Sequence, residues 1–313
     1  MISVQQAIEF ARRHFPEGPE RLAEHLGVPV RESPMDGCDG WCLATGDKSI
    51  IRINSKLSPA RKRFTLAHEL GHVILGVPTV IGESLEDILG SNSTEERRVN
   101  ELASELLIPT DIVKTSLPEL PIVATALKKL AKKSKVSELS TAIRVCNLAN
   151  QIGLDKAAVV LFDEDQVRWQ WSKTLKTISN ETAAKLLAES RKAAPRAFRH
   201  KRKQGDVIVA STIENPYFGS ATLFVQLLPA EIGMNLSRSE KRKQLEEILF
   251  VNDGKLQRRM AGLMGAHKKR IANMTKEQAE ADFWERNCKK LENTPVNSKQ
   301  GREYVRLRIS DWL

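Results

Sequence analysis

Two histidines and a glutamate stand at the spacing of a zinc hydrolase in the sequence His68-Glu69-Leu70-Gly71-His72. Residues four positions apart lie one above the other on a helix, so His68 and His72 can reach one tetrahedral zinc ion. Glu69 follows the first histidine, where its carboxylate can take a proton from the attacking water without binding the metal. The motif therefore predicts a zinc metallopeptidase with Glu69 as its catalytic base. The alternative is a core helix that carries two histidines by chance.

The residues on either side of the motif predict the helix that must position it. Ser58 can cap the first turn, and the ring of Pro59 is already set for that turn. Gly76 and Pro78 mark the end of the same helix. The motif thus falls in the body of a predicted helix of about five turns.

A tetrahedral site needs a third protein ligand, and the segment 93–109 offers acidic candidates. Apolar residues recur there at helical spacing before Pro109, and the predicted helix can be capped by Ser93 or Thr94. Glu96 is the preferred ligand and Glu95 the second choice, whereas Glu105 lies about two and a half turns further along. Only one of the three can bind the metal. The alternative is that all three are solvated surface charges.

Residues 51–109 combine these features into a recognisable pattern. Its second part reads Glu96-x-x-Val99-Asn100-x-Leu102-Ala103, after the Ser58-Pro59 start and the His68-Glu69-x-x-His72 motif. The stretch resembles the ImmA/IrrE family of zinc metallopeptidases, except that the family usually has Ala and Phe at Val99 and Leu102. The resemblance implies a zincin-like fold, Zn²⁺ on His68, His72 and Glu96, and a repressor with a helix-turn-helix domain as substrate.

Length and composition favour a multi-domain chain in the cytoplasm. With 313 residues, two domains or more are expected. The first residues lack the pattern of a signal peptide, and no apolar run approaches membrane-spanning length. The four cysteines show no disulfide framework for a chain of this size: Cys38, Cys42, Cys146 and Cys288.

Charge divides the chain into an acidic and a basic part. Residues 1–117 hold 13 Lys and Arg against 17 Asp and Glu, a net charge of −4, and residues 118–313 hold 36 against 22, a net charge of +14. The basic part predicts contact with a polyanion, although such runs also occur as solvated faces. The predicted nucleic-acid-binding residues come from its densest cluster, and they are Arg191, Lys192, Arg196, Arg199, Lys201, Arg202 and Lys203.

The N-terminal part is expected to place a small sheet beside the motif helix. Residues 1–30 are helical in pattern, and a hairpin follows that joins Trp41 to Thr45 with Ser49 to Ile53 around Gly46-Asp47. An edge strand next to a metal helix can pair with an extended substrate backbone. Ser49 to Asn54 is the candidate for that strand.

The predicted fold class is α+β with three parts. Residues 1–117 form the zincin-like peptidase domain, 118–154 a helix-turn-helix-like helical segment, and 155–313 a basic α/β domain with C-terminal helices. Strands are expected at Ala157 to Phe162, Val167 to Trp171, Val207 to Ser211 and Ser220 to Leu228, with 181–203 helical between them. This order is similar to the GAF-like domain of some ImmA/IrrE proteins.

A basic sensor domain behind a peptidase resembles the CapP proteases of antiphage (CBASS-type) signalling systems. That resemblance implies single-stranded DNA as an activator and a stress or antiphage response as the outcome. Two rival interpretations are a DNA-binding regulator with a structural metal site and an adaptor that holds a repressor without cutting it. A structural zinc more often has four protein ligands, frequently cysteines, whereas a general base stands beside this set.

Cys38 and Cys42 suggest a latch on the predicted zinc site. Both lie just before or in the first strand of the predicted hairpin that flanks the metal. A thiolate from either one can fill the position that the attacking water needs. The alternative is that both are small core residues.

Overall fold

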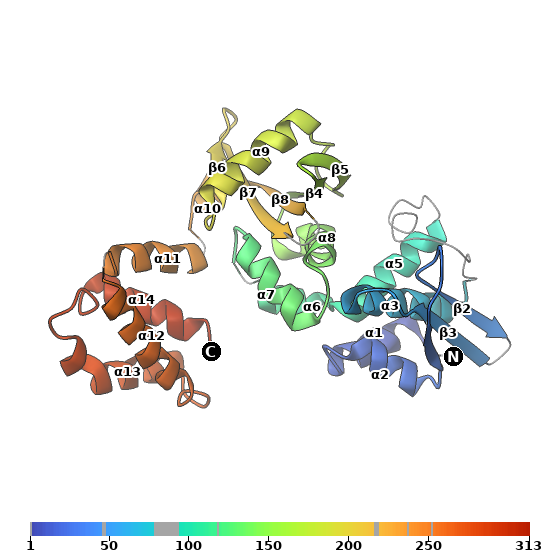
Figure 1. Ribbon diagram of the computed structural model, residues 1–313, viewed down its shortest axis with the longest axis horizontal. Coiled ribbons are helices and arrows are strands. Elements are labelled where there is room, and N and C mark those ends of the chain that lie inside the picture. The colour runs from blue at the N-terminus through green and yellow to red at the C-terminus, as the bar shows by residue number, and fades with distance from the viewer. Residues whose placement is uncertain are drawn as a thin grey trace. The chain divides into compact units, whose positions relative to one another are not determined.

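The chain divides into two compact units, Met1–Met234 and Asn235–Leu313 (Figure 1). The computed structural model describes residues 2–45, 48–77, 94–117, 119–215, 219–236, 238–251 and 253–313. The boundary between the units falls inside the segment 155–313, which the sequence analysis treats as one domain. The other two predicted domain boundaries, after residues 117 and 154, stay predictions.

The helix that carries the histidine motif begins and ends where its sequence predicts. Helix α3 spans Pro59–Leu75, and the Ser58 hydroxyl accepts a hydrogen bond from the Arg61 N–H at 3.4 Å. Gly76 ends the helix in the left-handed conformation, with φ 66°, which an L side chain rarely adopts. Pro78 lies outside the described residues.

A three-stranded sheet lies against this helix, preceded by helices α1 (Val4–Arg13) and α2 (Gly18–His25). Its order is β1-β3-β2, with strand bounds Val30–Ser33, Lys48–Asn54 and Gly40–Thr45. Strands β2 and β3 form the predicted antiparallel hairpin, whose turn at Gly46-Asp47 lies outside the described residues.

One expectation about this sheet is wrong, whereas the helical prediction for residues 1–30 is confirmed by α1 and α2, and only its last residue, Val30, lies in a strand. Residues Val30–Ser33 form β1 and pair in parallel with β3, so the helical pattern of residues 1–30 ends before Val30. As a result, Ser49 to Asn54 belongs to the central strand β3, and both of its edges are already paired. Strand β2 lies at the edge of the sheet and contacts α3, so β2 is the edge strand next to this helix.

The next segment is helical, as the sequence predicts. Helices α5 and α6 span Thr94–Leu107 and Thr110–Ser116, and the helix pair α7 and α8 spans Ala124–Ser134 and Glu138–Asn147, followed by a short 3-10 turn η1 at Ala149–Ile152. Lys135 takes a left-handed conformation between α7 and α8, and the Ser137 hydroxyl caps α8 by accepting from the Ser140 N–H. Ser93, the other predicted cap of α5, lies outside the described residues.

A five-stranded antiparallel sheet follows, in the order β5-β4-β8-β7-β6. Four of its strands match the prediction, and their bounds are β4 Lys156–Asp163, β5 Gln166–Trp171, β7 Asp206–Asn215 and β8 Ser220–Pro229. The helical prediction for 181–203 holds for α9 (Asn180–Ala193) and is wrong for Phe198–Lys201, which form β6. Pro195 cannot continue the helix, so the chain turns back and pairs with β7.

One hydrophobic core joins helices α3 and α5 to this sheet. Ala67 of α3 and Ala103 of α5 belong to the same buried cluster as Val159 of β4 and Phe224 of β8. Helices α7 and α8 supply the residues between them, whereas α9 packs on the sheet in a separate cluster. The N-terminal unit is therefore α+β, with the sheet and the metal-binding helices packed as one body.

The C-terminal unit is helical and has its own core, around fully buried Phe283 and Met260. Its helices are α11 (Arg238–Leu249), α12 (Gly254–Lys268), α13 (Lys276–Leu291) and α14 (Lys299–Ser310); the short helix α10 (Ala230–Gly233) precedes the unit. No helix in the described part of the chain has the length and apolar content to cross a membrane.

Candidate metal centre

Helices α3 and α5 bring His68, His72 and Glu96 together in a buried cluster. The Nε2 atoms of the two histidines lie 3.1 Å apart, and each lies 3.5 Å from one of the Glu96 carboxylate oxygens. Three ligands at about 2.0–2.1 Å from one zinc in tetrahedral geometry are roughly 3.3 Å from each other. The three side chains therefore fit a tetrahedral metal ion, and among the described residues no further His, Cys, Asp or Glu joins them.

The outer nitrogens of both histidines are held by oxygen atoms, which fixes the rings. His68 Nδ1 lies 3.0 Å from Asn100 Oδ1, and His72 Nδ1 lies 3.2 Å from the Val77 carbonyl oxygen. Since these oxygens accept hydrogen bonds, both Nδ1 atoms carry the proton and both Nε2 lone pairs point to the shared centre. Such partners set the tautomer and the orientation of metal-binding histidines.

Burial favours the protonation states that suit a cation at this centre. It lowers the pKa of His68 to about 3, with the neighbouring His72 adding to the effect and the bond to Asn100 opposing it. His68 therefore stays neutral at pH 7 and keeps its lone pair for a metal. Burial first, and then the charge of Glu95, raise the pKa of Glu96, so a bound cation would stabilise its ionised form.

Glu69 is buried beside the ligands and faces the start of β2. Its Oε1 would lie 3.7 Å from a Cβ atom placed at Gly40, which would also come within 2.4 Å of Thr65 Cγ2 and 2.8 Å of the Arg52 carbonyl oxygen. Only a glycine fits at that point. The absence of a side chain at Gly40 thus lets β2 approach the face of α3 that carries the candidate base.

Gly71 has a similar role between α3 and α5. A Cβ atom there would lie 3.0 Å from Val99 Cγ1 and 3.2 Å from the Val99 carbonyl oxygen. Gly71→Ala should therefore push α5 away and lower the free energy of unfolding by about 1–3 kcal/mol, measured by denaturant titration. As a control, Gly262→Ala in α12, where nothing lies within 4 Å, should leave stability equal or raise it. Equal effects of both substitutions would contradict this account.

The other acidic candidates of the same segment have different surroundings. Glu95 is exposed, while Glu105 forms an ion pair with Arg144 of α8 and accepts from the Thr110 N–H at 2.8 Å. Sequence reasoning gave Asn100 no role of its own. Its spacing was a usable signal, because residues four apart share a helix face, so Asn100 lies on the face of α5 that carries Glu96.

The two cysteines proposed as a latch lie in different environments. Cys42 sits on β2, paired in register with Ile51, and packs against the core of the three-stranded sheet. Cys38 is half-buried, and its thiol points to Met35 Sδ at 3.9 Å. Burial, followed by the charges of Asp39 and Glu69, raises the pKa of the Cys38 thiol. Among the described residues, the cluster of metal-binding atoms includes neither cysteine.

The predicted nucleic-acid-binding residues lie on α9, in the segment between α9 and β6, on β6 and in the turn after β6, and several are already paired. Arg191 bridges Glu214 and Asp165, Lys192 pairs with Glu189, and Arg202 with Asp206. Arg199 donates to the carbonyl oxygens of Gly233 and Ala197. Lys201 and Lys203 are exposed, and Arg196 is half-buried. Internal partners thus use much of the charge of this cluster.

Residues 23–145 match the IrrE N-terminal-like domain family. Over 123 residues the chain is 32% identical to the radiation response metalloprotease IrrE of Deinococcus radiodurans. The matched segment covers 36% of this chain and 35% of that protein. It is 31% identical over 130 residues to the protein of the same description from Deinococcus deserti, covering 36% of this chain and 46% of that one. The chain thus spans less than half the length of these relatives.

A solved structure of a Mycobacterium tuberculosis transcriptional regulator is also similar, with a TM-score of 0.49 and 16% identity over 76% of this chain and 79% of that one. The sequence comparisons and the buried cluster concern the same segment of the chain. The chain therefore contains an IrrE N-terminal-like domain of metalloprotease type, distantly related to radiation response metalloproteases, with His68, His72 and Glu96 as its candidate metal site.

Proposed function

We propose that the chain is a cytoplasmic, zinc-dependent endopeptidase that cleaves a helix-turn-helix transcriptional repressor. The observation that supports this most directly is the spacing of the His68, His72 and Glu96 ligand atoms at 3.1–3.5 Å, with Glu69 beside them. Two histidines and one carboxylate are a ligand set used by catalytic zinc, which keeps a position open for water and substrate.

In the proposed reaction, the side chains of α3 handle the protons. When bound, zinc polarises the scissile carbonyl and makes water a stronger acid. Glu69 accepts the proton of the attacking water and then delivers it to the departing amine nitrogen. Asn100 and the Val77 carbonyl hold the two histidines in the tautomer that this step requires.

Strand β2 is the element that would hold the substrate. It forms the outer edge of the three-stranded sheet, and Gly40 at its start lies next to Glu69. An extended peptide can add to such an edge by main-chain hydrogen bonds. The scissile bond of a peptide bound along β2 would then pass the candidate base.

We further propose that the five-stranded sheet and the C-terminal helices act as a GAF-like sensor whose binding of single-stranded DNA stimulates cleavage and starts an antiphage or stress response. The net charge of +14 over residues 118–313 supports a polyanionic activator. Within the predicted cluster, Lys192, Lys201 and Lys203 are exposed and accessible to DNA phosphates.

A cleavage assay tests this function. The zinc-loaded chain is incubated with the product of a neighbouring helix-turn-helix gene, with and without a short DNA strand, at low and high salt. We expect repressor cleavage that DNA accelerates, with less acceleration at high salt because phosphate contacts weaken. Cleavage that responds to neither DNA nor salt would refute the sensor, and an uncut repressor under all conditions would refute the peptidase.

A latch by Cys38 is the proposed control of basal activity, and it rests on the same metal site. Cys38 is the better candidate because it lies near enough to Glu69 for that charge, in addition to burial, to raise the pKa of its thiol, whereas Cys42 packs against the core. A bound metal would have to offset that rise. With Co²⁺ in place of zinc, we expect a thiolate-to-cobalt absorption band that Cys38→Ala removes and Cys42→Ala retains. Basal cleavage should rise only in Cys38→Ala. A spectrum without that band in the unsubstituted protein would exclude the latch.

A further inference from the structure

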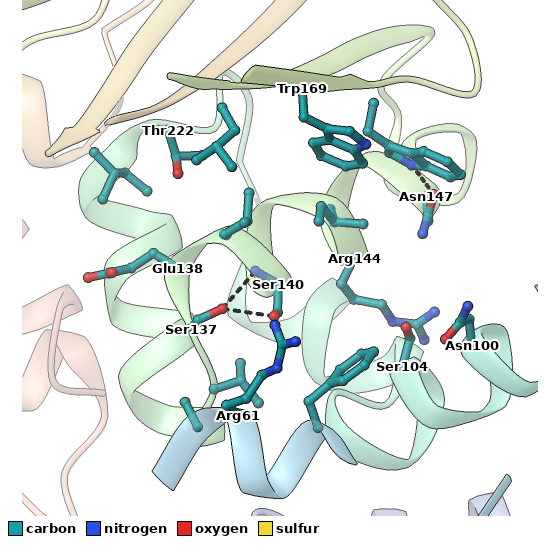
Figure 2. Close-up of a pocket in the computed structure, with 18 of the residues that line it drawn as sticks. Arg61, Asn100, Ser104, Ser137, Glu138, Ser140, Arg144, Asn147, Trp169 and Thr222 are labelled. Atoms are coloured by element: carbon teal, nitrogen blue, oxygen red, sulfur yellow. Dashed lines mark hydrogen bonds between the residues drawn. The ribbon is translucent and has the colours of Figure 1, made fainter. Parts of the chain in front are cut away.

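A cavity of about 1080 Å³ lies between the five-stranded sheet and the two metal-binding helices (Figure 2). Strand β5 supplies Trp169 on one side, α3 supplies Arg61 on the opposite side, and α8 lines the space between them with Ser140. All of these residues belong to the N-terminal unit. Pockets that hold small molecules have volumes of roughly 300–1,000 Å³, so this one has room for a ligand of nucleotide size.

The sheet side of the cavity offers a flat aromatic surface. The rings of Trp169 and Trp171 are stacked, with centroids 6.0 Å apart and an interplanar angle of 9°. The Trp171 indole N–H donates to Asn147 Oδ1 at 2.7 Å, which fixes that ring beside Trp169, and both rings line the cavity. Trp169 is half-buried and lines the cavity, and Figure 2 shows its ring directed into the space. A planar heteroaromatic ring can stack there.

The lining also carries polar groups suited to the edges of such a ring. The hydroxyls of Ser137 and Ser140 lie 2.8 Å apart on α8, and Thr222 of β8 lines the same space. Figure 2 places Ser140 and Thr222 on different walls. Hydroxyls both donate and accept, so they can serve the ring nitrogens and exocyclic groups of a base.

Two cations of the lining can exchange their partners for a phosphate. Arg168 pairs with Asp163 at 3.2 Å and Lys173 with Glu101 at 3.2 Å, and the four side chains are 44–66% exposed. Exposed pairs contribute little to stability, so an anionic ligand can displace either carboxylate at small cost. In contrast, Arg144 is buried and is held by Glu105 and by the Ile108 carbonyl oxygen.

We infer that this cavity binds a mononucleotide, with the base stacked on Trp169 and the phosphate at Arg168 or Lys173. The site also touches the metal centre. Phe64 lines the cavity and stacks on the His68 ring, with centroids 6.2 Å apart, while Asn100 lines it and holds His68 Nδ1 at 3.0 Å. A bound nucleotide therefore contacts two side chains that orient a candidate ligand, and its regulatory role rests on the proposed function.

Calorimetry with AMP, GMP, adenosine and a short thymidine oligonucleotide tests the binding. We expect AMP or GMP to bind one per chain, adenosine more weakly, and the oligonucleotide without competing for the site. Trp169→Leu should weaken binding at least about tenfold, since stacking is lost. Ser140→Leu should weaken binding, because the hydroxyl is lost and a larger side chain projects into the cavity, whereas Ala184→Leu on the exposed surface of α9 is the matched control and should not change it.

Thermal unfolding of each variant establishes that it is folded before binding is measured. The assignment is overturned if neither nucleotide binds, or if Ser140→Leu binds as tightly as the unsubstituted chain. If adenosine binds as tightly as AMP, the cavity has no binding site for the phosphate. If the oligonucleotide competes for the site, the ligand is a nucleic-acid strand and not a free nucleotide.

The effect of the bound nucleotide on the candidate metal site is measured separately. A chromogenic chelator reports the zinc affinity with and without nucleotide, and we expect a change of at least threefold that Asn100→Ala removes. If nucleotide binds and the zinc-loaded chain cuts no repressor, the proposed function fails and the cavity assignment stands. If the repressor is cut and no nucleotide binds, the cavity assignment fails and the proposed function stands.

Discussion

Replacing Glu69 with Gln should lower the rate of repressor cleavage by ~10³-fold while zinc binding stays within about twofold of the unsubstituted chain. The amide has nearly the same shape as the carboxylate but cannot accept the proton of the attacking water. Glu69 is buried on α3, and its Oε1 would lie 3.7 Å from a Cβ atom placed at Gly40. The amide can therefore occupy the same space, and the loss isolates the chemical step.

The measurement is a single-turnover cleavage assay at saturating zinc, together with metal analysis of the same sample. Asp39→Asn is a control for removing an acid nearby, because Asp39 is held in an ion pair by Arg61 and should not handle the proton. A Glu69→Gln variant that retains full biological function would favour the non-catalytic regulator or adaptor over the peptidase.

Glu96→Ala should lower zinc affinity roughly 100-fold or more, whereas Glu95→Ala should leave it within about threefold. The two glutamates are neighbours on α5, but Glu96 is buried with its oxygens 3.5 Å from each histidine, and Glu95 is exposed. Because both substitutions remove one negative charge from the same turn, the long-range effect of charge is matched. The difference between them reports direct ligation.

Competition with a chelator of known affinity gives the two constants, and circular dichroism establishes that α5 is retained. Equal losses in both variants would indicate that general charge, rather than ligation by Glu96, attracts the metal. A loss of cleavage in Glu96→Ala that excess zinc restores would agree with ligation, since added metal compensates for weaker binding.

Local signals made the metal helix predictable from sequence. Ser58, Pro59 and Gly76 act within one turn of their own positions, and the four-residue spacing of His68 and His72 follows from helix geometry alone. The four longer strands of the second sheet were predictable for a similar reason, because each has an apolar run with turn residues on both sides.

Features that depend on distant partners could not be read in this way. Strands β1 and β6 have four residues each, too few for a periodic pattern, and their pairing with β3 and β7 determines their conformation. The glycines at 40 and 71 are informative only when the neighbouring strand and helix are known. Likewise, no sequence pattern shows that Glu214 neutralises Arg191, or that α3, α8 and β5 enclose a cavity.

The core that Ala67 and Ala103 share with β4 and β8 bears on how such a chain can evolve. A hydrolase domain that has a hydrophobic core of its own can be joined to a new partner domain by gene fusion. Here the helices that present the histidines and the acid rest on the sheet itself, with Arg144 anchoring α8 to the end of α5. Exchanging the sheet for another would require helices α3 and α5 to be repacked at the same time, so the sheet and these helices would have to change together.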